Sequence, residues 1–350
     1  MNASTSPPIV VQYLYVHEPD EGFYYPTARA GSSAARVAQR YLECALTQAA
    51  SLALRDVECE LVLAMNVTDR TALGGAGVAL LEKIEELGTT IVPTPYVHRP
   101  KAGTEMYVSS RYVLDAVITS CAGLAPDRQV WLTDLDCVWV DPERVFASAP
   151  AAGAVGCVHI QYPPDWDLVE FEVYGRTRNA IGELAREMGA DVQTPPWVGG
   201  ELLTATPGTL REMVGVCEEL DEQLAAEGKT LPNEEQILSL AGALGRVHFT
   251  DLSAVARRIT TGPRSQAVPV PDPETIGLWH LPAEKGLSLR RTARQVRRGR
   301  VGPLLRDLTD PARAARRFNV AGAGPLRRLR DDGWIATQKL RSLRPHAAGG

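Results

Sequence analysis

The sequence predicts an α/β fold in which helices cover both faces of a mostly parallel central sheet, followed by a basic helical extension. Two observations predict it. Apolar runs of strand length alternate with helix-length segments through the first 140 residues, which is the pattern of parallel βαβ units. Residues 287–350 instead combine pairs of arginines with leucines at helical spacing.

The alternation gives a definite order of elements. Strands are expected at 9–16, 60–65, 90–92, 130–140, 155–160 and 247–249. Helices are expected at 32–54, 78–87, 105–122, 169–188, 207–227 and 233–244. Gly199 and Gly200 are expected to form a turn that leads into a further short strand, since glycine is common in turns. We therefore predict an α/β domain over residues 1–286 and a separate extension over residues 287–350.

Composition indicates a globular protein of the cytoplasm. The chain is 45% hydrophobic and 23% charged, and it contains no apolar run long enough to span a membrane. Its first residues lack the basic segment of a secretory signal peptide. The six cysteines are scattered without a Cys-x-x-Cys pair, so we expect reduced thiols and no zinc site.

Charge is distributed unevenly along the chain. Residues 287–350 hold sixteen Lys and Arg against four Asp, a net charge of +12, whereas the whole chain carries −5. Basic amphipathic helices of this kind can lie on an anionic membrane surface, which would make the protein membrane-peripheral. The alternative is a C-terminal region that packs on the acidic body. Nucleic acid is the least favoured partner.

Two aspartates one residue apart interrupt the apolar run Val130-Trp131-Leu132-Thr133-Asp134-Leu135-Asp136. On an extended chain both side chains point to the same side, and a buried carboxylate is costly unless it is paired or bound to metal. Hard oxygen ligands suit Mg²⁺ or Mn²⁺, ions that commonly accompany phosphate groups. The pattern predicts a metal–diphosphate site at a strand end, with a simple turn before Asp141-Pro142 as the alternative.

Further motifs follow one another between residues 105 and 286. They are Tyr107-Val108-Ser109-Ser110-Arg111-Tyr112 on a helix, Asp134-Leu135-Asp136, Trp197-Val198-Gly199-Gly200-Glu201-Leu202-Leu203, Glu235-Gln236 at a helix start, and finally His280 with Lys285-Gly286. In this order they resemble the GT-A glycosyltransferases, most closely the retaining family that includes bacterial lipopolysaccharide galactosyltransferases and glycogenin. The resemblance implies a GT-A fold and metal-dependent transfer of a sugar from a nucleotide-diphosphate-sugar, with a UDP-sugar expected. The acceptor is unidentified, with lipid-linked and natural-product acceptors both open.

The resemblance also implies a set of metal and donor ligands. Asp134, Asp136 and His280 would hold the metal, and the imidazole favours Mn²⁺ over Mg²⁺. Lys285 suits the β-phosphate, where negative charge grows as the sugar bond breaks. The full set of donor and diphosphate contacts that it implies is Arg111, Asp134, Gly199, Gly200 and Lys285.

Catalytic or sugar-binding roles are implied for Glu201, Glu235 and Gln236. An inverting enzyme needs a carboxylate base near the acceptor, and Glu201, Glu234 or Glu235 could supply it. A retaining enzyme needs no such base, because the leaving diphosphate can take the proton. The sequence leaves both stereochemical outcomes open.

Structural roles compete with these functional ones. Arg111 could form an exposed pair with Asp115 one helical turn later. The glycine pair could form a plain turn, and acidic residues around Glu235 suit any helix N-terminus. His280 could be an ordinary half-buried histidine, and Lys285 a solvated loop residue.

Two other functions compete with sugar transfer. Haloacid-dehalogenase-like phosphatases also carry Asp-x-Asp at the end of an apolar strand, and Lys285 and Asp331-Asp332 lie downstream here. That strand usually begins their domain, however, whereas about 130 residues precede it in this chain. The other alternative is a catalytically silent GT-A scaffold that binds a partner.

Overall fold

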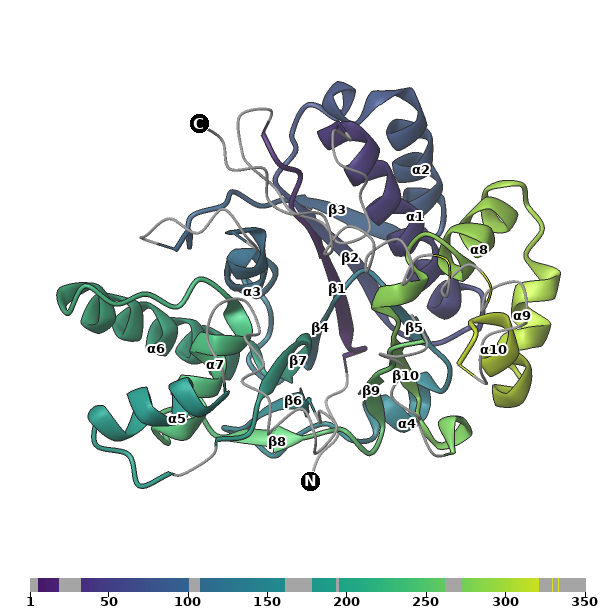
Figure 1. Ribbon diagram of the computed structural model, residues 1–350. Helices are drawn as coiled ribbons and strands as arrows, with labels where there is room; N and C mark the ends of the chain where they lie inside the picture. Colours follow the sequence, from purple (N-terminus) through teal and green to yellow (C-terminus); the bar gives the residue numbers. More distant parts are fainter. Residues whose placement is uncertain are drawn as a thin grey trace.

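The computed structural model describes residues 6–18, 33–100, 108–160, 178–192, 195–261 and 272–320, together with residues 329 and 333. Its main sheet has seven strands in the order β3-β2-β1-β4-β7-β6-β8 (Figure 1). Only the pairs that involve β7 are antiparallel, so the predicted mostly parallel sheet is confirmed. The strands are β1 (Ile9–Leu14), β2 (Glu60–Met65), β3 (Thr89–Pro93), β4 (Val130–Thr133), β6 (Val155–His159), β7 (Val198–Ala205) and β8 (Phe249–Asp251).

Helices cover both faces of this sheet, as Figure 1 shows. On one face lie α1 (Ala34–Ala53) and α2 (Gly74–Glu86); on the other lie α3 (Tyr112–Ser120), α5 (Arg178–Glu187), α6 (Pro207–Ala226) and α7 (Glu234–Ala243). Each strand contributes side chains to the cores on both faces of the sheet, because successive side chains point to opposite faces. In β1, Val11 packs in the core of the α3 and α6 side, whereas Leu14 packs with α1 and α2.

Most predicted elements are present, with shifted ends. The helix expected at 105–122 consists of a short 3₁₀ turn, η2 (Val108–Arg111), followed by α3. A second 3₁₀ turn, η1 (Arg70–Leu73), precedes α2, and a short helix, α4 (Pro142–Phe146), follows the segment with the two aspartates. The part of the expected helix 169–188 before residue 178 lies outside the described residues.

A second, three-stranded sheet was not expected from the sequence. It has the order β5-β10-β9 and consists of β5 (Cys137–Trp139), β9 (Ala256–Arg258) and β10 (Leu278–His280). Strands of three residues are too short to show a repeating pattern, so only long-range pairing reveals them. Two further 3₁₀ turns flank β10, namely η5 (Pro273–Thr275) and η6 (Pro282–Glu284).

The described part of the basic extension packs on the body of the protein. It forms α8 (Ser288–Arg297), α9 (Gly302–Leu308) and α10 (Pro311–Arg317), whose apolar side chains join the core of α1 and α2. Leu289 and Val296 of α8 are fully buried, and the Thr47 hydroxyl of α1 donates to the Leu289 carbonyl at 3.0 Å.

This packing favours the second interpretation of the extension for residues 288–320, in which it packs on the body. Leu289, Leu304 and Leu308 belong to the core of α1 and α2, so these leucines are not available to a lipid surface in this arrangement. Leu326, Trp334, Leu340 and Leu343 lie outside the described residues. The boundary after residue 286 stays a prediction. Among the described helices, none has the length and apolar character needed to cross a membrane.

Candidate metal and diphosphate site

The candidate site lies at the carboxyl ends of β1 and β4. The chain adds β2 and β3 on one side of β1 and then returns to place β4 on its other side. Ligand sites of open α/β sheets lie where the strand order reverses in this way, beyond the carboxyl ends of the strands. Asp134 directly follows β4, and Tyr13 lies near the end of β1, so both side chains are at this reversal point.

The small sheet brings His280 to the aspartates. β5 begins one residue after Asp136 and pairs antiparallel with β10, with Cys137 opposite His280. The Leu281 amide donates to the Asp136 carbonyl at 2.9 Å, which fixes this register. Residues that are 144 positions apart in the sequence are therefore held side by side by backbone pairing.

Asp134, Asp136 and His280 form a compact cluster of potential metal ligands. One ligand atom from each lies within 4.8 Å of the others, and His280 Nε2 is 3.4 Å from Asp134 Oδ2 and 3.2 Å from Asp136 Oδ2. Asp136 and His280 are buried, whereas the Asp134 side chain is about 30% exposed.

The cluster fits a divalent cation by its chemistry. Asp136 Oδ2 is buried and accepts no hydrogen bond from the described residues, although two cationic groups lie near it. Two carboxylates and one imidazole are ligands for Mn²⁺ or Mg²⁺, and the imidazole favours Mn²⁺. The three residues named from the sequence are thus brought together in an arrangement that could hold one ion.

Lys285 completes the charge balance of the cluster. Its Nζ lies 3.2 Å from Asp136 Oδ2 and 5.0 Å from the centre of the Tyr41 ring. Burial by itself raises the pKa of Asp136, but the Lys285 and His280 cations outweigh it and hold that pKa below its usual value. Burial lowers the pKa of His280, but Asp136 outweighs it and the pKa rises to about 9.

Tyr13 is a site residue that the sequence reasoning missed. Its hydroxyl donates to Asp134 Oδ1 at 2.5 Å and lies 3.3 Å from the Gly200 carbonyl oxygen. Burial and the neighbouring Asp134 raise the pKa of Tyr13 well above its usual value, so it remains a donor. Gln12-Tyr13, two polar side chains near the end of an apolar strand, was the signal that could have identified it.

Arg258 is the second missed residue, and it binds two of the predicted catalytic carboxylates. Its Nη2 lies 2.8 Å from Glu201 Oε2 and also contacts Glu235 Oε1. Glu235 Oε2 accepts a hydrogen bond from Trp197 Nε1 at 2.8 Å. Burial raises the pKa of Glu201, but Arg258 outweighs it and the pKa falls to about 2. Both carboxylates are buried and bound by Arg258, which opposes a role for either as a free base.

Glu201 also faces the metal cluster from behind. Its Oε1 lies 3.8 Å from His280 Nδ1, beyond hydrogen-bond distance, and both atoms are buried without a hydrogen bond in the described structure. A carboxylate on the far nitrogen of a metal-binding imidazole commonly sets its orientation. Glu201 therefore lies where a carboxylate could orient His280, and the catalytic or sugar-binding role that the resemblance implies for it stays a prediction.

The two glycines lie inside β7, so the predicted turn is wrong. The register between β6 and β7 shifts between Cys157 and Val158, next to Gly199, which indicates a bulge. A Cβ at Gly199 would lie 2.1 Å from Glu201 Oε2, and one at Gly200 would lie 2.6 Å from Glu234 Oε1. Glycine is required here because two glutamate side chains pack directly against the strand.

Glu234 differs from the other two glutamates because no cation pairs with it among the described residues. Its Oε2 is buried without a hydrogen bond. Burial, together with the negative charges of Glu235 and Asp134, raises the pKa of Glu234 to about 8. The carboxyl group is therefore neutral at pH 7.

This raised pKa predicts a pH-dependent difference between the wild type and Glu234→Gln. Between the unfolded pKa of about 4.3 and the folded value of about 8, the folded state binds the extra proton, so wild-type stability falls as the pH rises. The variant lacks this titration and should gain stability relative to the wild type, by up to about 1.4 kcal/mol per pH unit. Urea unfolding of both proteins at pH 5, 6.5 and 8 measures this difference in the free energy of unfolding. Parallel stability profiles for both proteins would contradict the raised pKa.

Arg111 lies away from the metal cluster. Its side chain is fully buried and forms two hydrogen bonds with Asp221 of α6, Nη1 to Oδ2 at 2.5 Å and Nη2 to Oδ1 at 2.9 Å. It also donates to the Leu231 carbonyl oxygen. The alternative pair with Asp115 is not present, because Asp115 binds His98 Nδ1 at 2.7 Å instead. The donor contact stays a prediction, although the Arg111 side chain is already bound to Asp221 and Leu231.

Gln236 caps a helix. The Asn233 side chain accepts from the Glu235 amide, and the Gln236 side chain accepts from the Asn233 amide at 3.4 Å, which closes a capping box at the start of α7. The side chain is fully buried. The helix-terminus role that the sequence left open is therefore the one observed for this residue.

Comparisons with known proteins give structural likeness without a family match. No family model matches the chain, and no curated protein matches it. Similar solved structures include the galactosyltransferase LgtC with donor and acceptor sugar analogs, which is 11% identical over 83% of this chain and 95% of that one, with a TM-score of 0.47. Mouse xyloside xylosyltransferase 1 is 9% identical over 79% of this chain and 97% of that one, with a TM-score of 0.46. The bifunctional glycosyltransferase WbbM is 11% identical over 79% of this chain and 46% of that one, with a TM-score of 0.46. Likenesses at this level assign no reaction to the chain, so its function has to rest on the site itself.

Proposed function

We propose that this protein is a metal-dependent glycosyltransferase of the GT-A type that uses a nucleotide-diphosphate-sugar as donor. The observation that carries the proposal is the cluster of Asp134, Asp136 and His280 with Lys285 beside it, at the strand-order reversal between β1 and β4. A divalent ion and an ammonium group together suit a diphosphate. A UDP-sugar donor and Mn²⁺ are the finer parts of the proposal.

The residues at the site have separable roles in this reaction. Asp134, Asp136 and His280 would hold the ion, which supplies positive charge to the leaving diphosphate. Tyr13 fixes the orientation of Asp134 through its hydrogen bond. Lys285 lies against Asp136, from where its ammonium group can bind a phosphate oxygen whose charge grows as the glycosidic bond breaks.

The glutamates bear on the stereochemistry. Glu201 and Glu235 are both bound by Arg258, and Glu234 is neutral at pH 7. A neutral carboxyl group can donate a hydrogen bond to a sugar hydroxyl but is a poor base. This supports transfer with retention, in which a diphosphate oxygen takes the proton from the acceptor.

A thermal-shift experiment with Mn²⁺ and a panel of nucleotide-sugars tests the proposal. A ligand that binds the folded state raises the unfolding midpoint in proportion to RT ln(1 + [L]/Kd), about 2.7 kcal/mol at a hundred times Kd. One donor is expected to stabilise the wild type in a metal-dependent way and to leave Asp136→Asn unchanged. Asp127→Asn, an exposed aspartate in the loop before β4, is the control and should respond like the wild type.

The other outcomes separate the competing functions. A panel in which no donor shifts the wild type, together with release of phosphate from p-nitrophenyl phosphate, would support a phosphatase. Binding of a donor without transfer or hydrolysis would support a silent scaffold. An equal shift in wild type and Asp136→Asn would refute the metal–diphosphate site.

A further inference from the structure

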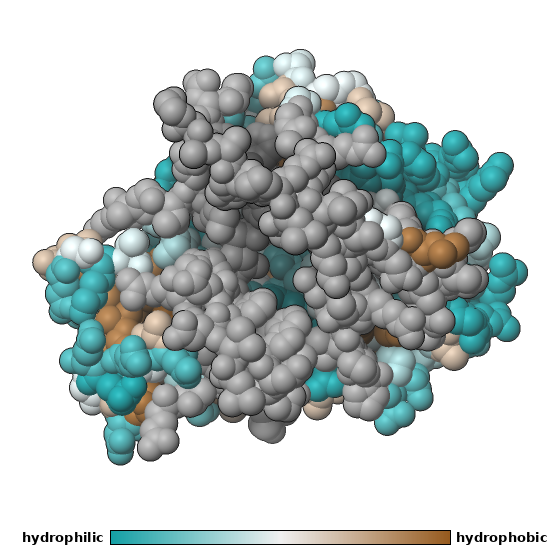
Figure 2. Space-filling view, in the orientation of Figure 1, coloured by the Kyte–Doolittle hydropathy of each residue, from teal (hydrophilic) through white to brown (hydrophobic). Residues whose placement is uncertain are grey.

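A groove lined by arginines lies on the surface of α8. It has a volume of about 400 Å³ and is lined by Arg290, Arg291, Arg294, Arg298 and Arg300, with Gln295, Gly286 and Leu287. Among the described residues, no carboxylate lines it. Figure 2 shows that the edge of the molecule where Figure 1 places α2 and α8 is mostly hydrophilic. We call these eight residues the arginine groove.

The charge of the arginine groove is not balanced within the described part of the chain. Arg290 Nε lies 3.4 Å from Glu43 Oε2, but Arg40 shares the same carboxylate at 3.6 Å. The salt bridges of the described residues include none to Arg291, Arg294 or to the two arginines that follow α8. Glu43 is the one carboxylate of the described residues that pairs with a groove arginine, so the five cations repel one another and an anion that enters the groove is stabilised.

The environment of Arg40 is affected by the same excess of positive charge. Its Nη1 is buried without a hydrogen-bond partner. Burial lowers the pKa of Arg40, and the charges of Arg290 and Arg294 lower it further, against the opposing effect of Glu43. This buried guanidinium group adds positive charge beside the groove without lining it.

A neighbouring hollow shows that the groove is unusual even for this arginine-rich region. It is lined in part by Arg313, Arg316 and Arg317, but Asp307 also lines it. Arg317 donates to Asp307 Oδ2 at 2.6 Å and to Gln295 Oε1. That hollow has an acidic residue in its lining, whereas no acidic residue is among the described residues that line the arginine groove.

The groove begins next to the proposed diphosphate site. Gly286, which lines it, directly follows Lys285. A Cβ on Gly286 would lie 3.6 Å from Arg40 Nη1, and Arg40 precedes Tyr41, whose ring lies against the Lys285 ammonium. Lys285, Arg40 and Arg290 thus place basic groups from the metal cluster to the groove.

We propose that the arginine groove binds an anion with clustered phosphates, the diphosphate of a phosphorylated acceptor. Arginine is suited to this role because its planar fork binds phosphate oxygens in pairs. The volume of about 400 Å³ is sufficient for a diphosphate with part of the group attached to it. The assignment to the acceptor rests on the proposed function; the anion site itself does not.

Calorimetric titration of inorganic pyrophosphate into the full chain, in EDTA and at low ionic strength, tests the site without the metal. Arg294→Gln/Arg298→Gln is expected to bind at least about tenfold more weakly than the wild type, since charge-assisted hydrogen bonds are lost. Both side chains are exposed, so folding should be unaffected. The matched control is Arg297→Gln/Arg306→Gln, two exposed arginines of the same region that do not line the groove. The control variant loses the same two positive charges as the groove variant, and its affinity for pyrophosphate should stay within about twofold of that of the wild type.

The outcomes separate this proposal from the proposed function and from a lipid source of phosphate. Equal affinity of the groove variant and the wild type for pyrophosphate would refute the proposal that the groove binds an anion. Loss of affinity in the groove variant, with its Mn²⁺-dependent donor shift intact, would support a second anion site. If no donor raises the unfolding midpoint of the wild type, the pyrophosphate result still supports an anion site in the groove, and only the assignment of that anion to an acceptor is refuted. Binding to phosphatidylglycerol vesicles that depends on Arg294 and Arg298, without binding of pyrophosphate, would replace the small anion by a membrane surface.

Discussion

Replacing Arg258 by methionine is expected to lower the free energy of unfolding by about 3–5 kcal/mol, because it leaves two buried carboxylates without their cation. Glu201 is 1% exposed and Glu235 is 3% exposed, and the same guanidinium nitrogen contacts both. Methionine fills a similar volume without charge, so the lost term is electrostatic. Urea unfolding at pH 7 measures the loss.

Two further variants show whether buried charge is the cause. Arg246→Met breaks a pair with Glu219, whose side chain is 63% exposed, and should cost less than about 1 kcal/mol. Adding Glu201→Gln and Glu235→Gln to Arg258→Met removes the uncompensated charges and should restore part of the stability. If Arg258→Met costs no more than Arg246→Met, the three residues are not the coupled buried network that the geometry indicates.

The same network should affect metal binding. Arg258 holds Glu201, and Glu201 faces the far nitrogen of His280. Partners of this kind typically change metal affinity by about 10–100-fold. Weaker Mn²⁺ binding by Arg258→Met, measured calorimetrically under conditions where it is fully folded, would show that the network supports the cluster as well as the fold.

Local patterns were sufficient to predict the centre of the site. Asp134 and Asp136 stand out because carboxylates are costly in an apolar strand, and that signal needs no knowledge of the tertiary structure. His280 was included only through the family resemblance. The pairing that brings it to Asp136 joins two three-residue strands, which are too short to carry a pattern of their own.

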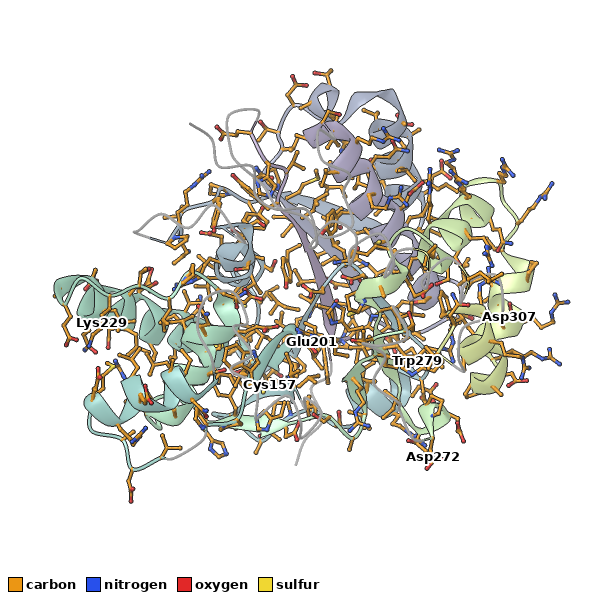
Figure 3. All side chains as sticks on the ribbon, in the orientation of Figure 1. Cys157, Glu201, Lys229, Asp272, Trp279 and Asp307 are labelled. Carbon is orange, nitrogen blue, oxygen red and sulfur yellow. The ribbon has the colours of Figure 1, made fainter. Side chains whose placement is uncertain are left out.

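The supporting residues could not be predicted for a related reason. Arg258 lies on β9, next to His280 in the small sheet, and nothing in Ala256-Arg257-Arg258 distinguishes it from a surface arginine. Gly199 and Gly200 were assigned to a turn, which is the more common place for glycine, whereas the reason for glycine here is the space taken by Glu201 and Glu234. Figure 3 shows Glu201 near the middle of the molecule, where both sheets approach it.

Arg111 shows how a correct helix can still leave the role of one of its residues undetermined. The helix that the sequence predicted is present in α3, but the arginine lies at its start and turns towards α6. A long polar side chain in an apolar helix signals a buried partner without identifying it, and here the partner is Asp221. The resemblance placed this arginine at the donor, and the contacts place it between two helices.

Arg111→Met is therefore expected to destabilise the protein by about 3 kcal/mol without changing the Mn²⁺-dependent response to the donor. The substitution removes two hydrogen bonds to Asp221 and one to the Leu231 carbonyl oxygen. Because Asp221 is 26% exposed, solvent compensates part of its lost charge partner, which places the cost at the lower end of the range for buried pairs. Thermal and urea unfolding measure the change.

An exposed pair of the same geometry supplies the control. Arg70 binds Glu85 with two hydrogen bonds of 2.7 Å, but these side chains are 45% and 36% exposed, so Arg70→Met should cost less than about 1 kcal/mol. The donor experiment then separates the two roles of Arg111. A donor-induced shift of normal size above the lowered midpoint means that Arg111 joins α3 to α6 and does nothing at the diphosphate. A normal midpoint with the shift lost would instead return Arg111 to the donor site and contradict its buried pair with Asp221.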